Sequence, residues 1–315
     1  MPRQRSRTSQ MIVPARTTKQ TGLIYQRHPD LEDAGPNATF WQGPYDATPS
    51  IEYGITQSMM GSFWCCRERF RLHYCEGLRE YEPWERVRAM EWGSMWHEGE
   101  HAILEDRDPH TAVLAYAATL ATRYRTKTTK IMNDAYMINL MLNYYIDYYK
   151  KHFTDTNIEP VWAESEFEVE VPIGSPDVFT QHPILRGKMD GVGLLPGPTR
   201  PCTYLMENKT KERINMDLIK SNLDYDNQVM TYLTALSKLT PEHNLPPVGG
   251  VVYNIIRRPR ANQTLSALEA HLRREPEHFF IRVIRSISTQ ELKEFAITTL
   301  RPTLYQICGW WNWIK

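Results

Sequence analysis

The chain has 315 residues, which is the length of about two average domains or of one elaborated α/β domain. Its 37 basic and 37 acidic side chains cancel, which excludes a uniformly basic coat and requires any polyanion site to be local. No apolar run approaches the roughly 20 residues of a membrane-spanning helix, so the sequence excludes a membrane-spanning protein. Five cysteines without regular spacing make no disulfide framework, which favours a reducing compartment.

The composition changes along the chain and predicts an arm followed by one domain. Residues 1–50 mix Pro, Thr and Asn with basic side chains near the start, which predicts an extended, partly flexible basic arm. Within the predicted domain, 51–315, helical periodicity dominates over 57–152. Residues 160–260 are expected to form a sheet and a helix, and 262–315 a mainly helical part with one further strand.

Three helices are expected before the sheet. The first is short and amphipathic, the second runs from Trp84 to about Glu105 and is ended by Pro109, and the third covers roughly 111–152 with a break near 127–130. One face of the third helix carries Met137, Leu140, Met141, Tyr144, Tyr145 and Tyr148. At helical spacing this stripe is typical of core packing, with a base-stacking platform as the alternative.

After Pro160 the hydrophobic period changes from 3.6 to 2. Residues 162–171 alternate, with Trp162, Glu164, Glu166 and Glu168 on the wet face and Ala163, Phe167 and Val169 on the dry face. Two more strands are predicted over 182–195 and 203–210, so the three form a meander. A helix over 217–238, a buried strand over 248–258 and a last strand over 278–288 complete a mixed sheet flanked by helices.

The chemistry concentrates on the second and third strands of the meander. Asp190 is expected to end the second strand, and Glu207 and Lys209 project from one face of the third, because residues i and i+2 of a strand share a face. Two converging carboxylates favour a hard divalent cation such as Mg²⁺ or Mn²⁺ between them. A lysine beside the ion can position water or balance charge on a phosphate, which is the arrangement for metal-assisted phosphodiester hydrolysis.

Two helical patterns flank these strands in the order that such a site needs. Upstream, Gly93-x-x-x-His97 brings an imidazole one turn beyond a small residue that permits close packing. Downstream, Gln228 and Tyr232 stand at i and i+4 on one helical face, where their amide and phenol can bind phosphate or base groups.

The ordered motifs are Gly93-x-x-x-His97, Gly187-x-x-Asp190, Glu207-Asn208-Lys209 and Gln228-x-x-x-Tyr232. This set resembles the RecB-type branch of the PD-(D/E)xK nuclease superfamily, which includes lambda-type phage exonucleases and CRISPR-associated exonucleases. Upstream, Cys66-x-x-x-Phe70 resembles a helix that commonly precedes the histidine motif of that branch. The resemblance spans roughly 57–240, and its strength lies in the order and spacing of the motifs.

The resemblance implies a restriction-endonuclease-like α/β fold with a mixed sheet flanked by helices. It implies one or two Mg²⁺ or Mn²⁺ ions held by His97, Asp190, Glu207 and the backbone carbonyl of Asn208. With Asp190 and Glu207, Lys209 would be catalytic, and Gln228 and Tyr232 would position the substrate strand. Relatives with an iron–sulphur cluster use several clustered cysteines, whereas Cys66 has only Cys308 to join here and no C-x-x-C occurs, so a cluster is not expected.

Several nearby side chains admit two interpretations. Glu164 or Glu166 would either join the metal shell or form the solvated face of the first strand, and His101 would be a second ligand or a surface histidine. Lys211 and Arg213 follow the catalytic strand and are candidates for phosphate contact. Other local basic residues have the same two interpretations; they are Arg257, Arg258, Arg260, Arg273 and Arg274.

The leading hypothesis is a metal-dependent deoxyribonuclease, an exonuclease of recombination, repair or phage DNA processing that leaves 5′-phosphates. The resemblance implies DNA as partner, a helicase or single-strand annealing protein as companion, and the cytoplasm of a bacterial or phage-infected cell, with an organelle left open. The site is expected at one edge of the sheet, where the second and third strands diverge. The rivals are a silent DNA-binding or assembly module with the same fold and a metal hydrolase acting on RNA.

Overall fold

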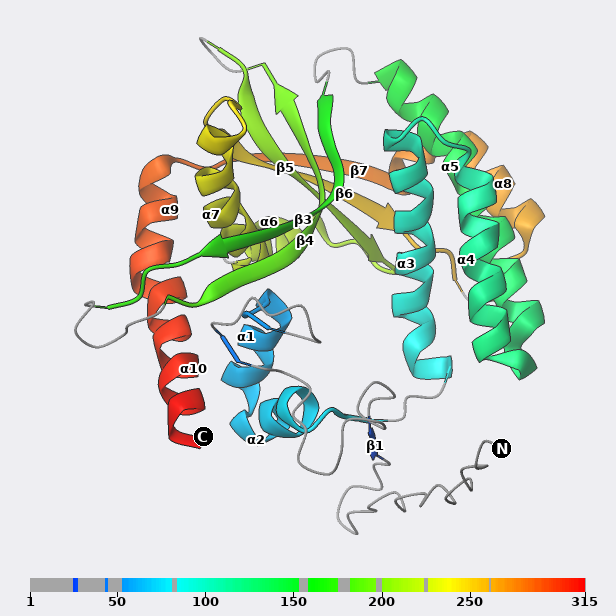
Figure 1. Cartoon of the computed structure of the whole chain (residues 1–315). Helices are drawn as coiled ribbons and strands as arrows, with labels where there is room; N and C mark the ends of the chain where they lie inside the picture. Colours follow the sequence, from blue (N-terminus) through cyan, green and yellow to red (C-terminus); the bar gives the residue numbers. More distant parts are fainter. Residues whose placement is uncertain are drawn as a thin grey trace, which may run out of the picture.

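The computed structural model describes residues 25–27, 43–44, 53–80, 84–152, 158–174, 182–196, 200–223, 226–260 and 262–314. Its centre is a five-stranded mixed sheet (Figure 1). The strands, in spatial order, are β3 (Glu159–Glu170), β4 (Ile184–Leu195), β5 (Cys202–Lys211), β6 (Val248–Arg257) and β7 (Phe280–Ser286). Only β5 and β6 run parallel, so the predicted meander, buried strand and last strand are confirmed, as is the mixed α/β fold.

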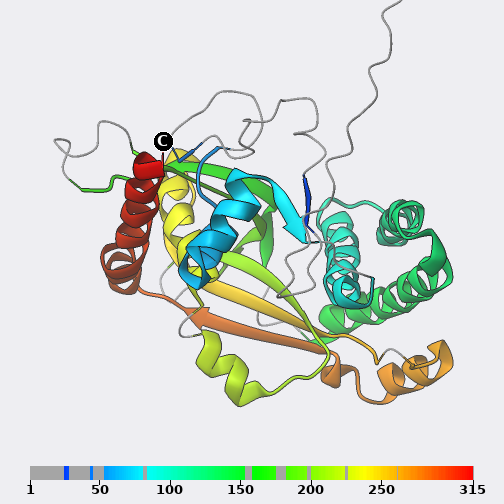
Figure 2. The ribbon, with the colours of Figure 1, turned by 90° about the horizontal axis from the view of Figure 1, so that it is seen from below.

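Helices surround this sheet (Figures 1 and 2). Those before the sheet are α1 (Gln57–Cys65), α2 (Arg67–Phe70), the π-helical turn η2 (Arg71–Cys75), α3 (Trp84–Leu104), α4 (Pro109–Arg123), the 3-10 turn η3 (Arg125–Lys127) and α5 (Thr128–His152). The later ones are α6 (Met216–Leu223), α7 (Asn227–Glu242), α8 (Leu265–Arg274), η4 (Pro276–His278), α9 (Thr289–Phe295), η5 (Ala296–Leu300) and α10 (Arg301–Ile314). A separate pair joins β1 (Tyr25–Arg27) to β2 (Leu78–Glu80).

Two helix boundaries differ from the sequence prediction, and both follow from capping. Pro109 begins α4 rather than ending the preceding helix, because Asp108 accepts hydrogen bonds from the first free backbone N–H groups and proline needs none. The helix predicted over 217–238 is two helices, since Asp226 caps a new start at Asn227. The predicted break near 127–130 is present at η3.

The hydrophobic core has two main parts, one on each side of the sheet. The first joins α1, α2, α7 and α10 to side chains such as Phe167, Met189 and Leu205. The second joins α3, α4, α5 and α8 to Phe280 and contains the stacked pair Trp92 and Trp96. Figure 1 shows these two groups of helices on opposite sides of the sheet. Functional side chains carried by α3 and α7 therefore reach the sheet from different parts of the core.

The aromatic stripe of the third predicted helix lies in the second part of the core. Met137, Met141 and Tyr145 of α5 are buried there, and Tyr144 and Tyr148 pack against it. Core packing is thus the correct interpretation of the stripe. Of the arm predicted over 1–50, all but residues 25–27 and 43–44 lies outside the described residues, and the domain boundaries stay a prediction. None of the described helices is long and apolar enough to cross a bilayer.

A buried ion pair connects α3 to α5. The guanidinium of Arg88 donates to both carboxylate oxygens of Asp134, at 2.8 and 2.5 Å, and Asp134 is only 1% exposed. A nearby ion pair between Lys127 and Glu85 connects η3 to α3, but this pair lies at the surface.

Arg88→Ala is expected to lower the free energy of unfolding by about 3–5 kcal/mol, because it leaves a buried carboxylate without its counter-ion. The matched control Lys127→Ala removes an exposed pair and should change stability by less than about 1 kcal/mol. Urea unfolding followed by circular dichroism measures both values. Equal effects of the two substitutions would show that the buried pair does not hold α3 against α5.

Candidate active site

The central feature of the site is the point where β4 and β5 separate. The two strands pair from Leu195↔Cys202 as far as Gly191↔Met206, and the next residues, Asp190 and Glu207, are no longer paired. Instead, the backbone N–H of Asn208 donates to Asp190 Oδ2 at 2.8 Å. The two carboxylates therefore stand at the mouth of a gap between strands. Their closeness follows from the register of the hairpin.

Two details of the expected position need correction. Asp190 lies inside β4, which continues to Leu195, because residues 191–195 still pair with β5 while residues 184–189 before Asp190 pair with β3 alone. The divergence is also between the second and third of five strands rather than at the outer edge of the sheet. The site therefore has β3 and β4 on one side and β5, β6 and β7 on the other.

Glu207 and Lys209 project from the same face of β5, and their side chains form an ion pair. Lys209 Nζ also donates to Gln228 Oε1 of α7 at 3.0 Å. The start of α7 is fixed by its cap, Asp226, whose carboxylate accepts a 2.6 Å hydrogen bond from the hydroxyl of Tyr253 on β6. A chain of contacts thus runs from β6 through the helix start to the lysine and the buried acid.

Asn208 points to the other face of the sheet. Its side-chain oxygen accepts a 2.8 Å hydrogen bond from Asn254 Nδ2, and Asn254 in turn accepts from Arg282. Because its side chain is held there, only the backbone of Asn208 faces the gap, and it already serves Asp190 through its N–H.

His97 reaches the gap from α3. Its Nδ1 lies 3.7 Å from Asp190 Oδ1, which is too long for a hydrogen bond. Burial lowers the pKa of His97 and outweighs the neighbouring carboxylates, so the ring stays neutral near pH 7. A neutral imidazole beside two carboxylates is in the protonation state that a metal ligand needs.

The carboxylates are held in an environment that opposes their charge. Glu207 is 1% exposed, and among the described residues neither of its oxygens receives a hydrogen bond of normal geometry, although Lys209 lies in contact. Burial raises the pKa of Glu207, and the charge of Asp190 raises it further against the opposing effect of Lys209. Burial likewise raises the pKa of Asp190. A buried acid without hydrogen-bond donors, as Glu207 is, fits a bound cation, and carboxylate oxygens suit Mg²⁺ or Mn²⁺.

Small residues make this close arrangement possible. A Cβ atom on Gly93 of α3 would lie 3.1 Å from the hydroxyl of Thr210, so the glycine lets this helix approach β5. A Cβ atom on Gly187 of β4 would lie 2.9 Å from the ring of Phe167 and 3.1 Å from that of Tyr232. Tyr232 consequently packs across the strand that carries Asp190, and its pKa is raised to about 12 by burial and by the site carboxylates.

A family model described as the PD-(D/E)XK nuclease superfamily matches residues 55–310. The chain belongs to the PD-(D/E)XK nuclease superfamily. This membership implies a phosphodiester-cleaving nuclease, and members of the superfamily typically use divalent metals such as Mg²⁺. A comparison with curated proteins finds no match. Glu207-Asn208-Lys209 has the (D/E)XK pattern, while Met189 rather than proline precedes Asp190.

Other residues singled out in this PD-(D/E)XK sequence lie apart from the gap. Lys211 is the last residue of β5 and Arg213 follows it, and both side chains are exposed. They form no ion pair within the described part of the chain. Three of the arginines considered for DNA contact have acidic partners close by: Arg258 with Glu212, Arg273 with Glu269 and Arg274 with Glu275. Their charges are thus partly neutralised within the protein.

Glu164 departs from the strand pattern that was predicted for it. It stands opposite Asp190, both are left out of the β3–β4 register, and its φ of +28° is a strained conformation for a residue with a side chain. Residues 161–165 are all half-buried, so the alternation of β3 is lost there, and the register with β4 shifts between Pro160 and Trp162. Trp162 packs against the core instead of facing solvent. Glu164 is half-buried and contacts Lys188 and His101, whereas Glu166 is exposed.

His101 is neither a plain surface histidine nor aimed at the gap. Its two ring nitrogens lie 3.2 Å from Glu164 and 3.1 Å from Glu105. It therefore belongs to a charged cluster beside the site. That cluster fixes the Glu164 side chain from the helix side.

Glu100 was missed in the sequence. It lies one turn beyond His97 on α3 and is 5% exposed, and burial raises its pKa to about 8, with the charge of Asp190 raising it further. An acid on an amphipathic helix is usually a surface residue. Only the packing of α5 against α3 shows that this one is buried.

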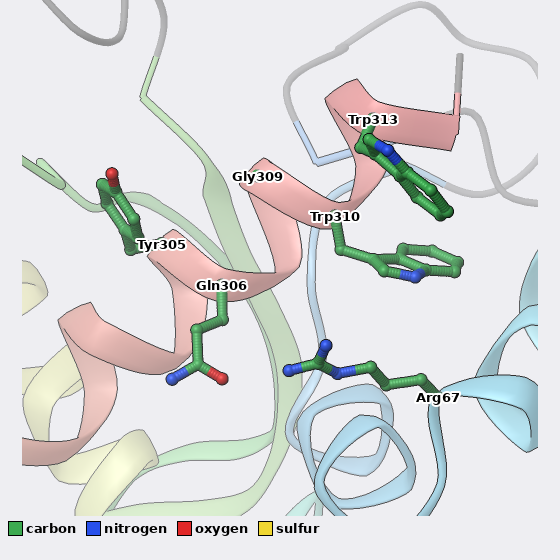
Figure 3. Close-up of a pocket in the computed structure, with 6 residues that line it drawn as sticks. All are labelled: Arg67, Tyr305, Gln306, Gly309, Trp310 and Trp313. Atoms are coloured by element: carbon green, nitrogen blue, oxygen red, sulfur yellow. The ribbon is translucent and has the colours of Figure 1, made fainter.

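An aromatic pocket of about 450 Å³ lies elsewhere, between α10 and α2 (Figure 3). Figure 3 shows Trp310 and Trp313 on one helix facing Arg67 on the other. The pocket shares no residue with the gap between β4 and β5, and no residue of the four sequence motifs lines it.

The raised carboxyl pKa values give a pH dependence to the metal-free protein. The folded state holds protons more tightly than the unfolded state, whose carboxyl pKa is near 4.5, so stability falls as pH rises from about 5 to about 8. Glu207→Gln should stabilise the metal-free protein by about 1–3 kcal/mol at pH 8.

Thermal unfolding in chelator across this pH range tests the expectation. Glu166→Gln is the control, since it neutralises an exposed acid, and it should leave the pH profile unchanged. Added Mg²⁺ should raise the melting temperature of the wild type and not that of Glu207→Gln. If the melting temperature of the wild type does not change from pH 5 to 8, the carboxyl pKa values are not raised in the folded protein.

Proposed function

We propose that the protein is a divalent-metal-dependent deoxyribonuclease that acts on DNA ends and leaves 5′-phosphates. The observation that carries the proposal is the convergence of Asp190, Glu207 and Lys209 at the divergence of β4 and β5, with His97 reaching the same point. Membership in the superfamily supports a nuclease; the DNA substrate, the preference for ends and the site roles are part of the proposal.

The proposed ligands are the side chains of His97, Asp190 and Glu207 with the backbone carbonyl of Asn208. A bound Mg²⁺ or Mn²⁺ ion, or a pair of them, would supply Lewis-acid polarisation of the phosphate and a lowered pKa of the attacking water. The neutral ring of His97 and the hydrogen-bond-free oxygens of Glu207 support this assignment.

Lys209 is assigned to charge stabilisation. Burial alone would lower its pKa, but the charges of Glu207 and Asp190 outweigh burial and raise it, so the side chain carries an ammonium group. A permanent ammonium donates hydrogen bonds and does not accept the proton of the attacking water. We therefore place Lys209 against the phosphate oxygens, where negative charge grows as water attacks phosphorus and the bond to the 3′ oxygen breaks.

Gln228 and Tyr232 are assigned to substrate positioning. Gln228 holds Lys209 through its amide oxygen, so its amide nitrogen remains available for a phosphate or base group. Tyr232 lies against Gly187 beside the carboxylates, and its raised pKa keeps the phenol protonated as a donor. Lys211 and Arg213 extend from the end of β5 as exposed cations and are proposed to contact the DNA backbone.

The same motifs support placement in the RecB-type or lambda-type branch. Gly93-x-x-x-His97 brings α3 onto β5, and Gln228-x-x-x-Tyr232 contacts both the lysine and β4. This placement suggests recombination, repair or phage DNA processing in the cytoplasm. A helicase or single-strand annealing partner, and the lack of an iron–sulphur cluster, stay predictions.

The nuclease is tested with linear double-stranded, linear single-stranded and closed circular DNA, and with RNA, in Mg²⁺, Mn²⁺ or chelator. Lys209→Met keeps the length of the side chain and removes its charge, and it should lower the cleavage rate by roughly 10²–10³. The control Lys238→Met alters a lysine of α7 that contacts the backbone of Glu170 and should retain activity.

Loss of linear DNA with circular DNA intact would support an exonuclease. Cleavage of RNA without cleavage of DNA would show that the substrate is RNA and that the proposed DNA substrate is wrong. If wild type and Lys209→Met are equally inert with either metal while DNA still binds, the protein is a binding module and the proposed catalysis is wrong.

Glu164 and Glu166 form a matched pair for the extent of the metal site. The charge of Glu164 acts on Asp190 and His97, and the same negative charge would attract a cation bound there. Glu164→Gln should therefore raise the Mg²⁺ concentration needed for half-maximal cleavage by roughly tenfold. The exposed Glu166→Gln should leave it unchanged. If both variants need the same Mg²⁺ concentration, Glu164 is not part of the metal site, which is then limited to residues of β4, β5 and α3.

A further inference from the structure

A second cluster of metal-ligating side chains lies outside the gap between β4 and β5, at the end of α8. His271 and Glu275 are one turn apart, and His278 follows in η4, so the spacing is His-x3-Glu-x2-His. His271 Nε2 lies 3.4 Å and His278 Nδ1 2.8 Å from the same oxygen, Glu275 Oε2. All three donor atoms lie within 4.8 Å of one another.

These distances match the separation of ligands around one ion. Donors about 2.0–2.1 Å from a tetrahedrally coordinated Zn²⁺ lie roughly 3.3 Å from each other. The cluster therefore needs only a small side-chain adjustment to bind an ion. Two imidazoles and a single carboxylate suit Zn²⁺ and disfavour Mg²⁺, which requires more oxygen ligands.

The surroundings hold each donor in place. Arg274 Nε contacts the other oxygen of Glu275, Oε1, at 2.7 Å, which leaves Oε2 for the histidines. The ring of Phe279, a buried residue, packs edge-on against His271 at 4.8 Å between centroids. Backbone hydrogen bonds from Glu275 to His271 and from His278 to Glu275 fix the turn that brings the three together. Outer contacts of this kind orient metal ligands.

We propose that His271, Glu275 and His278 form a zinc site that is separate from the nuclease centre. It would join the last turn of α8 to the segment that enters β7, where Phe279 and Phe280 are buried in the second part of the core. Three protein ligands leave a fourth position for water or for a side chain of a partner. The site takes a borderline divalent cation, and it does not depend on the proposed deoxyribonuclease activity.

Glu275 is in the state that such a site requires. The hydrogen bond from Arg274 lowers the pKa of its carboxyl group, so it is ionised at neutral pH. The histidines bind an ion as neutral rings.

The test measures Zn²⁺ binding to the chelator-treated full chain by equilibrium dialysis in excess Mg²⁺. It is carried out in the Glu207→Gln background, which weakens the other metal site. His271→Ala and His278→Ala should each lower the Zn²⁺ affinity by roughly tenfold or more, since even outer contacts change it by 10–100-fold. The control is His243→Ala, an exposed histidine at the end of α7.

Melting temperatures without metal show whether each variant folds. Zn²⁺ should raise the melting temperature of the Glu207→Gln and His243→Ala proteins and leave that of His278→Ala unchanged. The proposal is overturned if Glu207→Gln binds no Zn²⁺, or if His271→Ala and His278→Ala bind it as tightly as the control. Nuclease activity is not part of the readout, so failure of the proposed function would not affect this result.

Discussion

The close approach of two carboxylates, one of them buried, is the constraint on which the rest of the site depends. Glu207 is withdrawn from water and Asp190 is half-buried at the divergence of two interior strands, and the ammonium group of Lys209 opposes the charge of Glu207 directly. A buried charge without full compensation is costly, so the surrounding fold must pay for this arrangement.

The backbone around the carboxylates shows how the fold accommodates them. Glu164 adopts a left-handed conformation opposite Asp190, and the alternation of β3 breaks there. Gly93 and Gly187 admit Thr210 and Tyr232 to distances that a side chain at either position would obstruct. The second part of the core anchors α3 and the first anchors α7, so His97 and Gln228 approach the same gap from independently packed elements.

Much of this arrangement was predictable because it follows from short-range periodicity. The alternation of Phe167 and Val169 identified β3, and the i, i+2 relation of Glu207 and Lys209 predicted their shared face correctly. The break at Glu164 was not predictable, since it arises from the pairing of β3 with β4 rather than from the residues of β3. Glu100 was missed for a related reason: its burial depends on α5, which is distant in sequence. The start of α7 could have been found, because Asp226 is a recognisable cap.

Local charge pairing limits how many cationic side chains of this chain, which has no net charge, are left to bind a polyanion. Several arginines of the C-terminal half are held by nearby acids, among them Arg273, which stands four residues from Glu269 on a helix and could have been paired from sequence. The gap itself carries two carboxylates and Glu164 beside them, which would repel a phosphate in the absence of cations. On the proposed function, binding of a polyanion would therefore require the metal charge, and the exposed Lys211 and Arg213 at and beyond the end of β5 would add to it. Affinity and catalysis would then depend on the same ions, so removing the metal should weaken both together.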